Sequence, residues 1–159
     1  MSQIVHVVLT GGVGSRLWPL SRKTKPKQYL DIFSGFSLFE HTIKRNKSIS
    51  DKLVIVGNVD NIGLSVSSLN KLGVENAINI VEATPRNTAA AIAFSAFACN
   101  YDDILIVTPS DHVIEEGNLY TNSMNSAVEK AKQNFLVTFG IKPTKPETGF
   151  GYTEFANDS

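Results

Sequence analysis

The residues best suited to chemistry stand together near the N-terminus, directly after a short apolar run. Glycines there leave the backbone without Cβ atoms, so successive N–H groups can form a concave site for phosphate oxygens. Arginine and lysine side chains nearby would add positive charge to that site. A tight strand-to-helix turn would also use glycines, but it would not need the flanking cations. The loop residues are Gly11, Gly12, Gly14 and Ser15, and the nearby cations are Arg16, Arg22, Lys25 and Lys27.

Two common phosphate-binding loops do not fit this segment. A dinucleotide-binding turn has the spacing G-x-G-x-x-G and opens directly into a helix, whereas Leu17 takes the third glycine position and Pro19 follows. It also calls for an acidic residue at the end of the second strand, where Gly57 and Asn58 stand. A Walker A loop needs a lysine followed by serine or threonine at a fixed distance from a glycine, and the segment has none. A nicotinamide-dependent oxidoreductase and a P-loop NTPase are therefore both disfavoured.

A carboxylate follows a second apolar run, Ile104–Thr108, in the segment Pro109–His112. Proteins commonly hold Mg²⁺ with one or two carboxylates together with substrate phosphate oxygens. Asp111 is therefore the candidate metal ligand, with a helix N-cap as its alternative role. We assign no catalytic role to the neighbouring His112.

A third segment, Glu82–Thr88, lies between a strand pattern and an alanine-rich helix pattern. Asn87 or Thr88 can act as the N-cap of that helix, so capping alone would explain these two residues. It would not explain Arg86, which we expect near the same sheet edge as the glycine loop.

Apolar runs alternate with helical patterns along the chain. This order predicts a Rossmann-like, three-layer α/β/α fold with a predominantly parallel sheet, in which ligands bind at the carboxyl ends of the strands. Ser37 and Glu40 predict a capping box, and Gly73 predicts a helix end. The expected strands are Ile4–Leu9, Leu53–Gly57, Ala77–Val81, Ile104–Thr108 and Phe135–Phe139, with a further extended segment at Tyr152–Phe155, and the expected helices are Ser37–Arg45, Asn61–Leu72, Thr88–Cys99 and Tyr120–Gln133.

Composition narrows the function classes. With 159 residues, of which 42% are hydrophobic and 19% charged, the chain suits one compact domain. The formal net charge of zero gives no indication of a nucleic-acid partner. No apolar run approaches the roughly 20 residues of a membrane-spanning helix. The lone Cys99 and the lack of a signal-like N-terminus favour a cytoplasmic protein.

The glycine loop carries a family resemblance. The pattern Gly-Gly-x-Gly-x-Arg-Leu-x-Pro-Leu over residues 11–20, followed by Pro26-Lys27, resembles the signature of the nucleoside-diphosphate-sugar pyrophosphorylases, which are nucleotidyltransferases. The fuller run Arg16–Arg22 with Pro26-Lys27-Gln28 resembles the bacterial mannose-1-phosphate guanylyltransferase branch. The resemblance implies Mg²⁺-dependent transfer of GMP from GTP to mannose 1-phosphate, which yields GDP-mannose and pyrophosphate without a protein nucleophile.

The resemblance also implies roles for individual residues. Arg16 and Lys27 would bind the triphosphate and the leaving pyrophosphate, and Asp111 would bind Mg²⁺. The remaining assignments are Gly11, Gly12, Gly14, Ser15, Arg16, Arg86, Asn87 and Thr88 to the nucleotide, and Gly149 and Tyr152 to the sugar.

Members of the resembled family continue into a sugar-binding half with a second metal-binding aspartate. We therefore expect residues 1–159 to form the N-terminal, nucleotide-binding part of a nucleotidyltransferase domain, incomplete at its C-terminus. A sibling hexose-1-phosphate nucleotidyltransferase that uses another nucleotide, and a truncated non-catalytic nucleotide-binding module, remain alternatives. The hexose, the base and a homo-oligomeric state are left open at this point.

Overall fold

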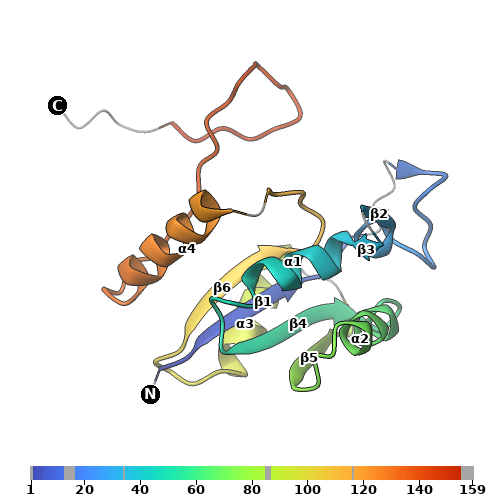
Figure 1. The fold of residues 1–159 in the computed structure, drawn as a ribbon, viewed down its shortest axis with the longest axis horizontal. Helices are drawn as coiled ribbons and strands as arrows, with labels where there is room; N and C mark the ends of the chain where they lie inside the picture. The colour runs from blue at the N-terminus through green and yellow to red at the C-terminus, as the bar shows by residue number, and fades with distance from the viewer. Residues whose placement is uncertain (1, 13–16, 34, 85–86, 116, 155–159) are drawn as a thin grey trace.

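A parallel sheet forms the centre of the molecule (Figure 1). The computed structural model describes residues 2–12, 17–33, 35–84, 87–115 and 117–154. Four strands, β1 (Ile4–Leu9), β4 (Lys52–Asn58), β5 (Ala77–Glu82) and β6 (Ile104–Pro109), lie in the order β5-β4-β1-β6, and every pair is parallel. The chain thus builds outward from β1 to β5 and then returns to the other side of β1. Four of the predicted strands and the parallel arrangement are confirmed.

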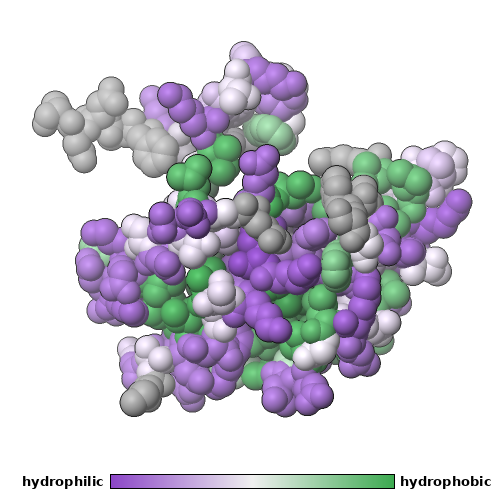
Figure 2. Space-filling view, in the orientation of Figure 1, coloured by the Kyte–Doolittle hydropathy of each residue, from purple (hydrophilic) through white to green (hydrophobic). Residues whose placement is uncertain are grey.

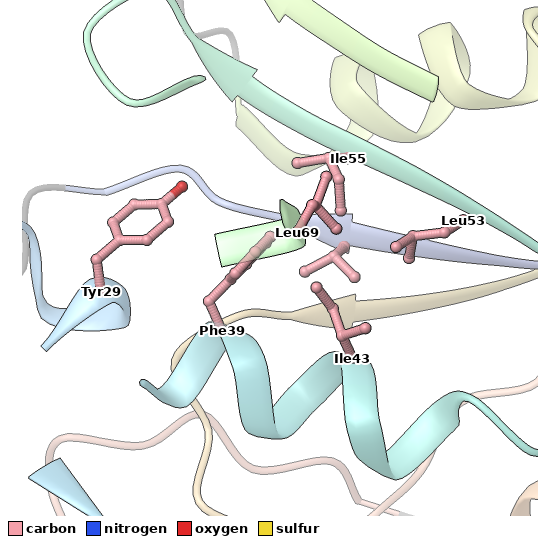
Figure 3. Close-up of a cluster of buried hydrophobic side chains, with 7 residues drawn as sticks. Tyr29, Phe39, Ile43, Leu53, Ile55 and Leu69 are labelled. Carbon is pink, nitrogen blue, oxygen red and sulfur yellow. The ribbon is translucent and has the colours of Figure 1, made fainter. Parts of the chain in front are cut away.

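Helices cover both faces of this sheet, which confirms the three layers. They are α1 (Leu38–Asn46), α2 (Ile62–Lys71), α3 (Asn87–Phe97) and α4 (Asn118–Ala131). Successive strand residues point to opposite faces, so Leu53 and Ile55 pack with α1 and α2, whereas Val54 and Val56 pack with Ala91 of α3. Figure 3 shows the first of these clusters between α1 and the sheet. Its buried members are Val8, Tyr29, Phe39, Ile43, Leu53, Ile55 and Leu69.

Local signals in the sequence set the helix ends. The Ser37 hydroxyl accepts a hydrogen bond from the Glu40 N–H at 3.2 Å, and the Glu40 carboxylate accepts one from the Ser37 N–H at 2.8 Å, which confirms the capping box. Gly73 holds a left-handed φ of +65° immediately after α2, where glycine avoids the steric cost of a Cβ. A short 3-10 helix, η2 (Lys27–Tyr29), and a small hairpin of β2 (Asp31–Phe33) and β3 (Phe36–Ser37) connect β1 to α1.

The predicted strand Phe135–Phe139 is wrong. The segment follows α4 as irregular chain, with Phe135 60% and Leu136 fully exposed. Figure 2 shows hydrophobic side chains at the surface where this segment leaves α4. An apolar run becomes a strand only beside another strand that takes up its backbone hydrogen bonds, and no described strand pairs with it. Residues 152–154 of the expected extended segment Tyr152–Phe155 form no strand either, and Phe155 lies outside the described residues.

None of the described helices is both long enough and apolar enough to cross a bilayer.

Candidate functional site

The glycine loop and the Asp111 loop begin side by side at the carboxyl edge of the sheet. β1 and β6 are neighbours paired up to Leu9 and Pro109, and the Ser110 N–H donates to the Leu9 carbonyl at 3.1 Å. The chain reverses its building direction between these two strands. In open parallel sheets this switch point leaves a crevice at the carboxyl ends, where ligands bind. The sequence therefore predicted correctly that the two loops meet.

Lys27 and Asp111 face each other at this edge, although 84 residues separate them. The Lys27 Nζ lies 3.4 Å from the Asp111 Oδ2, and the two side chains are 31% and 43% exposed. A partly exposed ion pair this long contributes little to stability, so both groups remain able to bind a ligand. The cation predicted for phosphate and the carboxylate predicted for metal are thus brought to one place.

The buried Gln28 side chain holds the glycine loop in place through hydrogen bonds, a role that the sequence analysis missed. Its side chain is 2% exposed, and its Nε2 donates to the carbonyls of Thr10 at 2.7 Å and Gly12 at 3.3 Å. The C=O and N–H of one trans peptide point in opposite directions, so the bond to the Thr10 carbonyl turns the Gly11 N–H away from Gln28. Gly12 has a φ of +101°, which strongly favours glycine. The loop is therefore pre-organised to offer an N–H group to an anion.

Gly57 at the end of β4 makes room for the residue that starts this loop. The Thr10 side chain is fully buried, and its hydroxyl donates to the Val56 carbonyl at 2.9 Å. A Cβ at position 57 would collide with the Thr10 Oγ1. The glycine that argued against a dinucleotide site is thus required for packing beneath the candidate site.

Other predicted site residues fall into two groups. Gly14, Ser15, Arg16 and Arg86 lie outside the described residues. Asn87 and Thr88 are exposed and open α3, with Asn87 in a left-handed conformation at a φ of 65°. Thr88 lies inside the helix as its second residue, which does not fit the N-cap role considered for it.

Gly149 and Tyr152 are not brought to the Lys27–Asp111 edge. Within the described chain their hydrogen bonds are local: the Tyr152 hydroxyl accepts from the Glu147 N–H at 2.8 Å and donates to the Glu147 carbonyl at 3.0 Å, while the Gly149 N–H donates to the Glu147 carboxylate. Figure 1 shows this segment beyond α4 and away from the sheet. Their role in sugar binding stays a prediction.

The donor set at the edge fits Mg²⁺ carried by a substrate better than a metal held by protein alone. Among the described residues, no group of three or more His, Cys, Asp or Glu side chains could hold a metal ion. Asp111 offers one hard carboxylate, and the nearest imidazole nitrogen, the His112 Nε2, is 4.0 Å from its Oδ1. Mg²⁺ keeps several waters and commonly takes one carboxylate plus phosphate oxygens, so Asp111 is a suitable single protein ligand.

A buried histidine, His6, lies within β1 and contacts β6. The His6 side chain is 1% exposed, and its Nε2 lies 2.8 Å from the Thr108 hydroxyl of β6. Burial, and secondarily the charge of Arg45, lowers the pKa of His6 from 6.5 to about 3. His6 is therefore neutral near pH 7, and it belongs to the scaffold.

Comparison with known proteins identifies the family. The chain matches the nucleotidyl transferase family over residues 5–159. The xanthan biosynthesis protein XanB of Xanthomonas campestris pv. campestris (strain B100) is 40% identical over 156 residues, which is 96% of this chain and 33% of that protein. The mannose-1-phosphate guanylyltransferase RfbM of Salmonella typhimurium (strain LT2) is 42% identical, over 92% of this chain and 32% of its own length.

A solved structure agrees with these matches. The crystal structure of mannose-6-phosphate isomerase from Helicobacter pylori superposes with a TM-score of 0.79 at 37% identity, over 93% of this chain and 54% of that chain. The chain spans about a third of the length of the curated relatives named above. With the glycine loop, the parallel sheet and the family match in agreement, this chain belongs to the nucleotidyl transferase family.

Proposed function

We propose that this chain is the nucleotide-binding part of an enzyme that transfers GMP from GTP to mannose 1-phosphate, with Mg²⁺, to give GDP-mannose and pyrophosphate. The observation that carries the proposal is the Lys27–Asp111 pair at the crevice between β1 and β6, beside a glycine loop fixed by Gln28. The names of the relatives, among them RfbM, support guanine and mannose as the substrate groups.

In the proposed reaction a phosphate oxygen of mannose 1-phosphate attacks the α-phosphorus of GTP. The bond between the α-phosphorus and the oxygen that links it to the β-phosphorus breaks, and pyrophosphate leaves with that oxygen. Bound Mg²⁺ would offset negative charge on the phosphates, held on the protein side by Asp111. No side chain needs to become a nucleophile.

The chain's own residues orient the triphosphate and neutralise it. The Lys27 ammonium moves from the Asp111 carboxylate to a phosphate oxygen, because a triphosphate carries more negative charge than one carboxylate. The Gly11 N–H, already turned outward by Gln28, needs no reorganisation to bind a phosphate oxygen. Arg16 adds a second cation in the proposal, on the resemblance of its loop alone.

Nucleoside contacts would come from the start of α3, which follows β5. Asn87 and Thr88 are exposed at the start of α3, where the helix N-terminus favours acceptor groups. Together with Arg86 we assign them to the guanine and the ribose. Gly149 and Tyr152 are assigned to the sugar.

The test is nucleotide binding measured by calorimetry with GTP, ATP, dTTP and UTP, each with Mg²⁺ and with a chelator. We expect GTP to bind most tightly, and Mg²⁺ to strengthen the binding. Lys27→Met removes a charge-assisted contact, so GTP affinity should fall about 10-fold or more even with the chelator present. Asp111→Asn should instead abolish most of the gain that Mg²⁺ provides.

Two matched variants serve as controls. Lys23→Met removes an exposed lysine near the same loop, and Asp102→Asn changes an exposed aspartate in the turn before β6, at the opposite end of that strand. Both should leave GTP binding unchanged. Equal binding of all four nucleotides would refute the guanine preference, and full affinity in Lys27→Met would refute the site. Tight GTP binding without GDP-mannose formation by the full-length natural protein would favour a non-catalytic module.

A further inference from the structure

Arg45 at the end of α1 is a buried cation with an unusual environment. Its side chain is 8% exposed, and no carboxylate forms an ion pair with it in the described part of the chain. Its Nε has no hydrogen-bond partner there. Burying a guanidinium costs free energy, which its contacts must offset. The contacts of Arg45 therefore indicate its role.

The contacts of Arg45 lead to the connection between β6 and α4, which begins with Ser110 and Asp111. The Arg45 Nη1 donates to the Ile114 carbonyl at 3.4 Å, and its guanidinium carbon lies 5.3 Å from the centre of the Tyr120 ring. Ile114 follows Asp111 by three residues, and Tyr120 lies in the first turn of α4. The Arg45 side chain thus contacts the connection near its middle and also contacts the first turn of α4, where the connection ends.

A second residue of α1, Asn46, also holds Tyr120 in place. The Tyr120 hydroxyl donates to the Asn46 Oδ1 at 2.7 Å, and the fully buried Asn46 donates in turn to the Thr42 carbonyl at 2.9 Å. Tyr120 is therefore a fixed surface for the guanidinium. At the other end of the connection, the Ser110 N–H is bound to the Leu9 carbonyl of the sheet. Asp111 lies between a point anchored on the sheet and a point anchored on α1.

We propose that Arg45 is a positioning residue: by holding Ile114 and Tyr120 it fixes the connection that carries Asp111, and so keeps that carboxylate opposite Lys27. The metal half of this inference rests on the proposed function, whereas the structural half does not. Residues that contact a metal ligand, and not the metal itself, commonly change metal affinity about 10-fold to 100-fold when they are altered. Arg45 acts on Asp111 indirectly in the same way, so we expect an effect of similar size.

The experiment compares Arg45→Met and Arg45→Lys with Lys44→Met as the matched control. Lys44 is the preceding residue of α1 and also stacks on an aromatic ring, that of Phe36 at 3.7 Å, but it is exposed. The first readout is amide hydrogen exchange in the free chain. In Arg45→Met, the amides of residues 121–124, the first hydrogen-bonded amides of α4, should exchange about 10-fold faster, with α2 unchanged; in Lys44→Met both regions should match the wild type.

The second readout is the ratio of GTP affinities with Mg²⁺ and with a chelator. Arg45→Met should lower this ratio about 10-fold while the affinity in chelator stays the same, and Arg45→Lys should recover little because one ammonium cannot both stack and reach Ile114.

The outcomes separate this inference from the proposed function. Unchanged exchange over residues 121–124 in Arg45→Met would overturn the inference whatever the nucleotide data are. If Mg²⁺ clearly strengthens GTP binding by the wild type and strengthens it equally in Arg45→Met, the claim that Arg45 supports metal binding by Asp111 would be overturned. Faster exchange together with no nucleotide binding by the wild type would support the positioning role and refute the proposed function.

Discussion

Acidification should destabilise this protein through the buried His6 side chain. Burial lowers the pKa of the His6 imidazole from 6.5 to about 3, so between these two pH values only the unfolded chain takes up the proton. The unfolded state then binds more protons than the folded state, which means that the free energy of unfolding falls as pH decreases below 6.5. From pH 7 to pH 5 the expected loss is about 2 kcal/mol.

Urea unfolding followed by circular dichroism at pH 7, 6 and 5 measures this loss. For an m-value of about 2 kcal/mol/M, the midpoint should move down by about 1 M over the range. His6→Gln is the control, because a glutamine amide can still bond with the Thr108 hydroxyl but does not titrate. The variant should lose most of the slope between pH 7 and 5. An equal slope in both proteins, or a wild-type loss below about 0.5 kcal/mol, would refute the burial argument.

Two further predictions concern the residues beneath the glycine loop. Gln28→Met leaves the Thr10 carbonyl without its 2.7 Å donor and should destabilise the fold by about 1–3 kcal/mol while also weakening GTP binding, as urea unfolding and calorimetry would measure; unchanged values of both would contradict the role given to Gln28. Gly57→Ala places a Cβ against the Thr10 hydroxyl and should cost about 1–3 kcal/mol. Thr10→Ala in that background should recover part of this cost, and strict additivity of the two changes would argue against the contact.

Features that depend on neighbours in sequence could be predicted well. The capping box at Ser37 and the helix end at Gly73 depend on hydrogen bonds within a few residues, so their residue types are informative by themselves. The meeting of the Lys27 and Asp111 loops followed from one general rule, that parallel strands present their carboxyl ends at one edge.

Features that depend on packing between distant segments could not. Gln28 resembles any polar residue beside a lysine until the fold brings it under Thr10, and Arg45 resembles a solvated helix residue until α4 covers it. The strand expected at Phe135–Phe139 failed for a related reason, because composition reports a preference for burial but does not supply the neighbouring strand.

The most direct test of the central claim is a crystal structure of the chain with GTP and Mn²⁺, in which anomalous scattering locates the metal. The account predicts the triphosphate at the carboxyl ends of β1 and β6, with the metal bound by an Asp111 oxygen and by phosphate oxygens, and the Lys27 Nζ within hydrogen-bond distance of a phosphate. A nucleotide bound elsewhere on the molecule, or a metal without Asp111 among its ligands, would contradict it.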